Sequence, residues 1–270
     1  MFEGILVVVK GGGDLGTGVV HRLHRAGMKV VVIEVAQPTV IRRAVAFASA
    51  VYEGEVEIEG VVARRAEDAS QALDLLEKGA IPVVIDPTAS LVKRLKPLVL
   101  VDAIVAKRNI GTNIDDAPVV IALGPGFTAG LDAHAVIETQ RGHHLGRVIL
   151  EGSAQPDTGL PGAVMGYTTE RVLHAPVAGV FQSVRRIGER VVEGQIVAYV
   201  DDAPVRAGIS GVLRGLLADG LTVRKGMKIG DIDPRGVVEH CFAISDKARA
   251  VGGGVLEAIL YLLKERGISV

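Results

Sequence analysis

The sequence predicts an α/β fold in which a domain with a mostly parallel sheet precedes a small β domain. Two observations carry this prediction. In the first half, buried β-branched runs alternate with segments of helical periodicity. In the second half, the chain repeats itself at an offset of 32 residues. We place the first domain at 1–160, the second at 173–235, and a C-terminal helical segment at 240–270 that packs back on the first.

The elements of the first domain follow from apolar runs and their spacing. A continuous β-branched run at 5–9 indicates a strand buried on both faces, and the periodic segment after it indicates a helix that Gly27 ends. Strands joined by right-handed helical crossovers are expected to form a parallel, Rossmann-like sheet. The same criteria predict strands at 30–35, 81–85, 99–105 and 119–123, helices at 38–47, 67–78 and 90–95, one or two short strands within 51–63, and a hairpin at 134–150.

A glycine-rich segment joins the first strand to the first helix. Residues 11–16 read GGGDLG and match G-x-G-x-x-G, and Glu34 ends the next strand 18 residues later. Such glycines allow a tight turn, close approach of a diphosphate and close helix–strand packing, while the carboxylate can bind a ribose diol. A turn packed only against protein is the alternative. The residues expected to bind a dinucleotide are Gly11, Gly12, Gly13, Asp14, Leu15, Gly16, Thr17 and Glu34.

Charged residues in and after this turn refine the expectation. Glu34 favours a free ribose 2′-hydroxyl, and therefore NAD over NADP. Asp14 would repel a diphosphate, so we expect its carboxylate to cap the helix. Lys107, Asp132 and His134 follow later strands and are the candidate catalytic residues, with solvated or hydrogen-bonded loop residues as the alternative. Because no group of residues has metal-ligand spacing, no metal site is expected.

The second half is organised by its repeat. Residues 175–181 align without a gap on 207–213, and three glycine pairs recur at the same offset. One repeat of short strands cannot bury its apolar face alone, whereas two related by a pseudo-two-fold axis can. The pattern resembles the biotinyl/lipoyl domain, a barrel-sandwich hybrid that carries its prosthetic group on a lysine in the hairpin between its halves. The joining segment 201–205 reads DDAPV, so neither biotin nor lipoate is expected.

After residue 234 the chain is predicted to turn helical again. Ser245 is a suitable N-cap, and 255–263 is apolar nearly all round, which indicates a buried helix. The glycines at 252–254 favour a close-packed bend before that helix, with an anion-binding helix start as the alternative. Cys241 is expected to be a small buried residue, with a reactive thiolate as the alternative.

Composition and net charge limit the kinds of partner that the protein is expected to bind. The formal net charge of −1 creates no field for nucleic acid or an anionic membrane, and a single cysteine excludes a disulfide framework. No uncharged apolar run approaches the ~20 residues that span a bilayer, and the start has no basic leader. We expect a cytoplasmic protein with neither a nucleic-acid nor a membrane partner. The sequence leaves the oligomeric state open.

Long segments of the chain carry a family resemblance. They include GGGDLGTGVVHRLHRAG, PTVIRRAVAFASAVYEG, ALGPGFTAGLDAHAVIETQRGHHLG and ISDKARAVGGGVLEAIL. These runs resemble the YqeB-like family of selenium-dependent molybdenum hydroxylase system proteins. The resemblance implies an accessory or maturation protein with a Rossmann-like N-terminal domain that works beside hydroxylase subunits. Lys10 departs from the pattern, because arginine is more usual before the glycine turn.

Three functions are compatible with these observations. A maturation factor would bind NAD or a molybdopterin dinucleotide, since both carry the diphosphate and ribose that a glycine turn recognises. An NAD-dependent oxidoreductase would also need an acid or base facing the nicotinamide. A non-catalytic scaffold would use the β domain to bind a hydroxylase subunit. The glycine turn does not distinguish among them, so the sequence leaves open whether the protein is an enzyme.

Overall fold

The computed structural model describes residues 2 and 4–268. The chain is mixed α/β, with one large, mostly parallel sheet and several antiparallel sheets. It divides into two compact units. Unit 1 takes the described residues of Met1–Pro38, Phe47–Asp157 and Ile244–Val270, and unit 2 takes Thr39–Ala46 and Thr158–Ala243. The short segment 39–46 therefore belongs to unit 2, although the residues before and after it in the sequence belong to unit 1.

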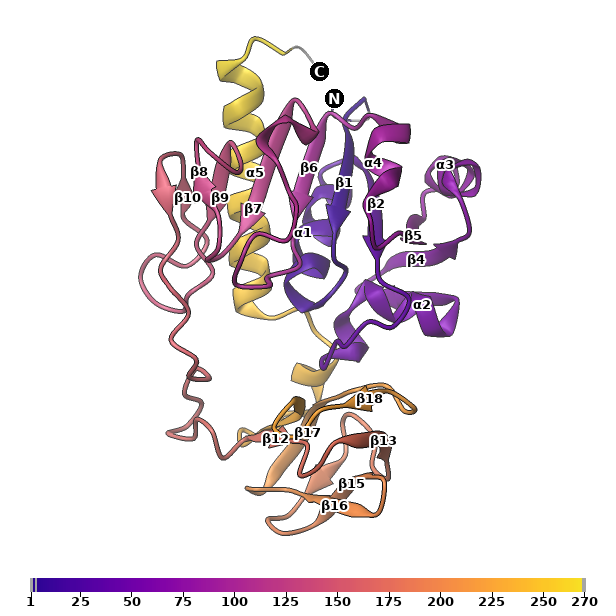
Figure 1. Cartoon of the computed structure of the whole chain (residues 1–270), viewed down its shortest axis with the longest axis vertical. Helices are drawn as coiled ribbons and strands as arrows, with labels where there is room; N and C mark the ends of the chain where they lie inside the picture. The colour runs from indigo at the N-terminus through magenta and orange to yellow at the C-terminus, as the bar shows by residue number, and fades with distance from the viewer. Residues whose placement is uncertain (1, 3, 269–270) are drawn as a thin grey trace. The chain divides into compact units, whose positions relative to one another are not determined.

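The core of unit 1 is a nine-stranded sheet of order β10-β9-β7-β6-β1-β2-β5-β4-β3 (Figure 1). Its inner strands are parallel, and the two edge strands, β3 and β10, pair antiparallel with their neighbours. A separate antiparallel pair joins β8 (Thr128–Ala129) to β11 (Gly152–Ser153). The sheet strands are β1 (Leu6–Lys10), β2 (Lys29–Glu34), β3 (Glu55–Ile58), β4 (Val61–Ala66), β5 (Ile81–Ile85), β6 (Val99–Asp102), β7 (Val119–Leu123), β9 (Ala135–Ile137) and β10 (Val148–Ile149).

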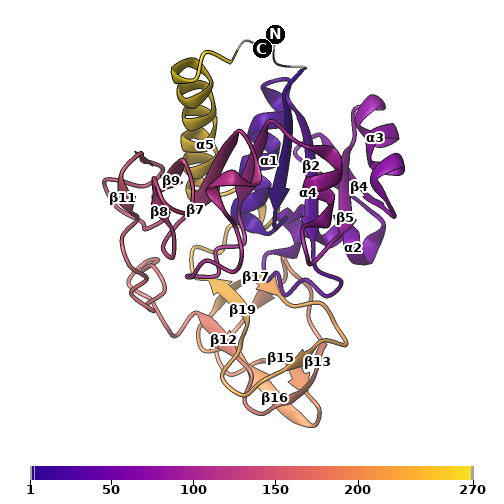
Figure 2. The ribbon, with the colours of Figure 1, turned by 45° about the horizontal axis from the view of Figure 1, so that its top comes forward.

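Helices cover both faces of this sheet (Figure 2). Helices α1 (Asp14–Arg25), α2 (Ala50–Glu53) and α5 (Asp246–Glu265) share one apolar core with Val7 and Val9 of β1. Helices α3 (Ala69–Glu77) and α4 (Ser90–Leu95) share the other core with Val8. Because side chains alternate along a strand, β1 supplies both cores and is buried on both faces, as predicted.

No helix within the described residues is long and apolar enough to span a membrane.

Helices α1 and α5 pack against each other through glycines. A Cβ on Gly18 would approach the carbonyl oxygen of Ala248 to 2.5 Å, and a Cβ on Gly252 would approach that of Gly18 to 2.6 Å. A Cβ on Gly254 would overlap the carbonyl oxygen of Gly146. The predicted close packing is confirmed, but the glycines lie inside the helix instead of before it. An anion-binding helix start at 252–254 is therefore wrong, because α5 begins at Asp246 after its N-cap Ser245.

The predicted helix at 38–47 is also wrong. Residues 39–42 are not helical, and two 3₁₀ turns follow, η1 (Arg43–Val45) and η2 (Phe47–Ser49). The backbone of this segment pairs with unit 2, since the N–H of Leu216 donates to the oxygen of Ile41 at 2.9 Å. Tertiary pairing has overridden the local helical pattern.

Unit 2 consists of two four-stranded antiparallel sheets of orders β12-β19-β17-β14 and β16-β15-β13-β18 (Figure 1). Strands β13 and β17 begin 32 residues apart, as do β14 and β18, and β15 and β19. Their pairings correspond as well: β13 pairs with β15 and β18, and β17 pairs with β19 and β14. The sequence repeat is thus a structural repeat. The strands are β12 (Val172–His174), β13 (Gly179–Ser183), β14 (Arg190–Val191), β15 (Ile196–Val200), β16 (Ala203–Arg206), β17 (Gly211–Leu216), β18 (Thr222–Val223) and β19 (Lys228–Asp233).

Candidate functional site

The glycine turn lies at the carboxyl end of β1, where the strand order reverses between β1 and β6. Gly11 adopts φ +93°, a left-handed conformation that favours glycine, and a Cβ there would lie 3.2 Å from the backbone of Ala103. A Cβ on Gly16 would overlap the carbonyl oxygen of Gly11. The first glycine therefore permits the turn and the third permits helix α1 to approach it.

The backbone of Gly12 is fully bonded within the protein. Its N–H donates to Glu34 Oε2 at 2.9 Å, and its oxygen accepts from the N–H of Ala48 at 2.9 Å and from Thr17 Oγ1 at 3.0 Å. The same Thr17 hydroxyl accepts from the N–H of Phe47 at 2.9 Å. A diphosphate at this turn would consequently meet the partly exposed residues 13–15 at the start of α1, where the first helical amides lie.

Glu34 lies at the end of β2, beside the turn. Besides the Gly12 N–H, its carboxylate accepts the N–H of Val35 through Oε1 at 2.8 Å. An ionised carboxylate has about four acceptor positions, so two backbone donors leave it able to accept hydroxyls. The side chain of Glu34 is half-buried, so its carboxylate has both the exposure and the unused acceptor positions that a ribose diol would need.

Asp14 does not cap helix α1. The N-cap is Gly13, which makes no side-chain capping bond, and Asp14 is the first residue of the helix. The expected capping role is therefore wrong, because the helix begins one residue earlier than that role requires. A carboxylate in the first turn still interacts favourably with the helix dipole.

Lys247 lies in the first turn of α5, at the same end of the α1–α5 pair as Asp14, since the two helices run parallel. Burial and the nearby charge of Arg141 lower the pKa of its ammonium group. The carboxylates of Asp14, Glu138 and Asp157 act in the opposite direction. Several charged groups therefore surround the start of α1.

Sequence reasoning missed a buried polar cluster between β1 and β6. Lys10 Nζ donates to Thr112 Oγ1 at 2.5 Å and lies 3.6 Å from Asp102 Oδ2, while Thr112 Oγ1 donates to Asp102 Oδ2 at 2.6 Å. All three residues are almost wholly buried. Charges in a low-dielectric interior must be paired, and this pair joins the ends of two strands at the point of order reversal. The sequence shows only that one apolar strand ends in lysine and another in aspartate, and the pairing of β1 with β6 brings the two residues into register.

The three candidate catalytic residues are held by separate contacts. Lys107 forms an ion pair with Asp157 at 2.6 Å. Asp132 accepts from Asn109 Nδ2 at 3.1 Å and from the N–H of Thr128 at 2.8 Å, so its carboxylate orders the loops after β6 and β7.

His134 lies near the amino end of β7, whereas the glycine turn lies at the carboxyl end of β1. His134 Nδ1 accepts the N–H of Val120 at 2.9 Å, and burial, together with Arg266, lowers the pKa of the imidazole. His134 bonds to the backbone of β7, whereas Asp132 bonds to Asn109 and Thr128, which follow β6 and β7. The contacts of these two side chains therefore do not join them as an acid–base pair. Among the described residues, no three metal-ligating side chains are grouped to hold an ion.

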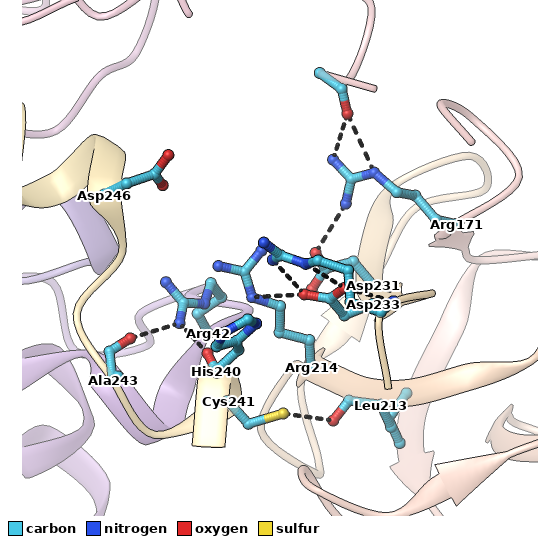
Figure 3. A network of polar contacts seen from close by, with 12 residues as sticks. Arg42, Arg171, Leu213, Arg214, Asp231, Asp233, His240, Cys241, Ala243 and Asp246 are labelled. Atoms are coloured by element: carbon cyan, nitrogen blue, oxygen red, sulfur yellow. Dashed lines mark hydrogen bonds and ion pairs between the residues drawn. The ribbon is translucent and has the colours of Figure 1, made fainter. Parts of the chain in front are cut away.

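Unit 2 contains a second polar cluster, around the end of β19 (Figure 3). Arg171 forms an ion pair with Asp231 at 3.2 Å, and Arg235 forms one with Asp233 at 2.6 Å. Nearby Cys241 is fully buried and its thiol points to the oxygen of Leu213 at 3.8 Å. Burial raises the pKa of the Cys241 thiol. Cys241 is thus a small buried residue, as the preferred interpretation of the sequence predicted.

The chain is similar to one curated protein over nearly all of its length. It is 55% identical over 260 residues to the "Uncharacterized protein YqeB" of Escherichia coli (strain K12), which covers 96% of this chain and 48% of that protein. The chain thus spans about half the length of the curated relative it matches. No protein-family model matches the chain.

Solved structures add little to this similarity. The product-bound ectoine utilization protein EutE (DoeB) from Ruegeria pomeroyi is 12% identical, with 85% of each chain covered and a TM-score of 0.26. An aspartoacylase family protein from Mesorhizobium loti is 10% identical, with 84% of each chain covered and a TM-score of 0.26. Scores this low carry no argument about fold or function. The similarity supports the YqeB-like part of the resemblance alone, because the relative is named as uncharacterized and its name says nothing of a hydroxylase system.

Proposed function

We propose that this chain is an accessory protein of a selenium-dependent molybdenum hydroxylase system that binds a dinucleotide, either NAD or a molybdopterin dinucleotide, at the glycine turn of a Rossmann-like sheet. The observation that carries the proposal is the hydrogen bond between Glu34 and the Gly12 N–H, which fixes a carboxylate beside the turn. Ligands of open parallel sheets bind at the carboxyl ends of the strands where the strand order reverses. The glycine turn and Glu34 both lie there.

Each part of the proposed site has a distinct task. The first amides of α1 receive the diphosphate, because they lack partners within the helix and lie at its positive end. Glu34 accepts the hydroxyls of one ribose. The ion pair between Lys10 and Asp102 fixes the ends of β1 and β6, and so holds the floor of the crevice.

Thermal unfolding tests this proposal. NAD, NADP, CTP and isolated molybdenum cofactor are added separately, and a ligand at 100 times its Kd should stabilise the protein by about 2.7 kcal/mol. Gly13→Val should abolish that shift with the fold retained, since the backbone of Gly13, with φ −68°, is one that an L-residue adopts without strain. Gly253→Val, at a helical site with open space, is the control that keeps the shift. An unchanged shift in Gly13→Val would contradict the role of the turn.

A scaffold function is the second candidate, and the repeat in unit 2 supports it. We propose that unit 2 is a barrel-sandwich hybrid without a prosthetic group, because the turn between β15 and β16 is formed by Asp201 and Asp202 instead of lysine. Exposed apolar side chains on this unit include Val180, Val184 and Val192. Stabilisation by a hydroxylase subunit, with none from any nucleotide, would favour the scaffold. The oxidoreductase alternative has less support, since Lys107, Asp132 and His134 are held by other contacts.

A further inference from the structure

The loop that follows β6, residues 103–113, which we call the β6 loop, is packed against two turns of unit 1. A Cβ on Gly11, in the glycine turn, would lie 3.2 Å from the carbonyl group of Ala103. A Cβ on Gly126, in the turn after β7, would overlap the backbone of Arg108. All of these residues belong to unit 1. The β6 loop therefore has the glycine turn on one side and the turn after β7 on the other.

One asparagine holds the C-terminal half of the β6 loop. Asn109 Oδ1 accepts the N–H groups of Gly111 and Thr112, both at 2.9 Å. Asn109 Nδ2 donates to the oxygen of Thr112 at 2.8 Å and to Asp132 Oδ1 at 3.1 Å. The Thr112 hydroxyl is itself part of the buried polar cluster between β1 and β6. The amide of Asn109 has two donor and two acceptor positions, so every one of them is used to fix the loop.

Two residues of the β6 loop have left-handed backbones. Val105 has φ +56° and Lys107 has φ +63°. A left-handed φ is uncommon for a residue with a Cβ, and for a β-branched valine it is an outlier. Such backbones persist only where the surrounding contacts determine them, and they are concentrated at ligand-binding sites. The contacts of Gly11, Gly126 and Asn109 determine the conformation here, so the β6 loop is fixed before any ligand binds.

The β6 loop carries two cations that differ in their contacts. Lys107 forms an ion pair with Asp157 at 2.6 Å. Arg108 is exposed, and its guanidinium has no hydrogen bond or ion pair with any described residue. Ile104 and Ile110 of the same loop are 40% and 49% exposed. The fixed loop therefore offers one unpaired guanidinium, whose planar donor fork suits a carboxylate or a phosphate, together with apolar surface.

The strand order indicates which half of a dinucleotide would meet this loop. The order is β6-β1-β2, with the glycine turn after the central strand of the three. A dinucleotide lies across the point where the strand order reverses, with its two halves on either side of the turn. The half whose ribose Glu34 accepts lies on the side of β2. The second head group consequently lies on the side of β6, next to the β6 loop.

We propose that Arg108 binds an anionic group, a carboxylate or a phosphate, on the second head group of the dinucleotide, so that the site prefers such a ligand to NAD. This inference rests on the proposed function and narrows its ligand. NAD ends in a nicotinamide, which has a positively charged ring and a neutral amide. Arg108 would repel that ring and would gain no ion pair from the amide. An anionic head group would gain a charge-assisted hydrogen bond instead.

Two dinucleotides that differ in one group test this inference by calorimetric titration of the full chain. Nicotinic acid adenine dinucleotide carries a carboxylate where NAD carries the amide, and the rest of the molecule is the same. The wild type should bind the acid about tenfold more tightly than NAD, the factor that one hydrogen bond between charged groups contributes. Arg108→Met should remove this preference and leave the Kd of ADP-ribose, which has no nicotinamide ring, unchanged. Arg108→Lys keeps the charge without the fork and should retain part of the preference.

Arg94→Met is the matched control. Arg94 is also exposed and also lacks a bond to any described residue, but it lies in the last turn of helix α4. The variant therefore removes the same charge from unit 1 without touching the β6 loop, and it should keep the tenfold preference. Since neither arginine forms a bond within the protein, both variants should unfold at the temperature of the wild type.

The outcomes separate this inference from the proposed function. If the wild type binds NAD and the acid equally, or if Arg108→Met keeps the preference that Arg94→Met keeps, the role of Arg108 is wrong and the dinucleotide site stands. If only the isolated molybdenum cofactor binds, its Kd should rise about tenfold in Arg108→Met alone, and an equal Kd in the two variants overturns the inference. If none of these ligands binds, the proposed function fails and the inference fails with it.

Discussion

Two glycine-rich segments of this chain look alike in the sequence and have different roles. Residues 11–16 form a strand-to-helix turn, in which Gly11 needs a left-handed backbone and Gly16 admits helix α1. Residues 252–254 lie within helix α5, where Gly252 and Gly254 admit the backbones of Gly18 and Gly146. The first segment forms the turn between β1 and α1 at the carboxyl end of the strand, and the second allows helix α5 to pack closely on its neighbours.

This comparison shows that a run of glycines acquires its meaning from the elements on either side. The turn at 11–16 follows a buried strand and precedes a helix, which is the context that a dinucleotide-binding turn requires. The run at 252–254 has helical periodicity on its C-terminal side and the N-cap Ser245 before it. Substituting single glycines with alanine and measuring the free energy of unfolding can test how much each segment depends on the missing side chain.

The largest effect is expected for Gly16→Ala. Its Cβ would overlap the carbonyl oxygen of Gly11, a residue whose N–H donates to the oxygen of Ile33 at 2.9 Å and which lies against the backbone of Ala103. Overpacking against fixed backbone should lower the free energy of unfolding by about 3 kcal/mol. Urea unfolding followed by circular dichroism measures the change. If the free energy of unfolding falls by no more than it does for an ordinary surface substitution, the backbone of the turn can shift to accept a side chain at position 16.

A smaller loss is expected for Gly254→Ala. Its Cβ would overlap the carbonyl oxygen of Gly146, but Gly146 lies in a loop between β9 and β10 that can shift more readily than a strand end. Gain of helix propensity also offsets part of the overlap. We expect a loss of about 2 kcal/mol in the same unfolding experiment. A loss larger than that of Gly16→Ala would reverse the proposed ranking of the two segments.

The smallest effect, and one of opposite sign, is expected for Gly253→Ala. No atom of the described residues lies within 4 Å of a Cβ at this position, in the middle of α5. Alanine should therefore stabilise the protein by about 1 kcal/mol through helix propensity alone. Because positions 253 and 254 are adjacent on one helix, the pair separates propensity from packing. Destabilisation by Gly253→Ala would mean that the helix is covered on this side as well.

The alternation of strands and helices, the hairpin partners β9 and β10, and the 32-residue repeat were predictable from the sequence, because each depends on local periodicity or on internal similarity. Of the one or two strands expected within 51–63, β3 lies inside this range, whereas β4 runs on to Ala66 and helix α2 occupies Ala50–Glu53. The helix expected at 38–47 failed for a physical reason: Ile41 and Arg42 pair with β17, a contact that no local pattern encodes.

The candidate site was predictable only in part. The glycine turn and Glu34 were found by their spacing, but the bond between Glu34 and Gly12 and the buried cluster of Lys10, Asp102 and Thr112 depend on which strands become neighbours. Asp132 and His134 are close in the sequence, yet a loop that returns along β7 gives them different partners. Proximity in the sequence therefore did not make the two side chains hydrogen-bond partners.

The packing of α5 on α1 has a consequence for how the protein is made. Helix α5 buries the face of the sheet that carries Val7 and Val9, yet 108 residues separate its last residue, Glu265, from Asp157, where the preceding part of unit 1 ends. The ribosome needs roughly 5–20 s to translate these residues. During this interval unit 2 can fold on its own contacts, while an apolar surface of the nascent sheet stays open to water. Chaperone holdases in the cell should therefore engage this chain before α5 emerges, and release it once the helix has docked.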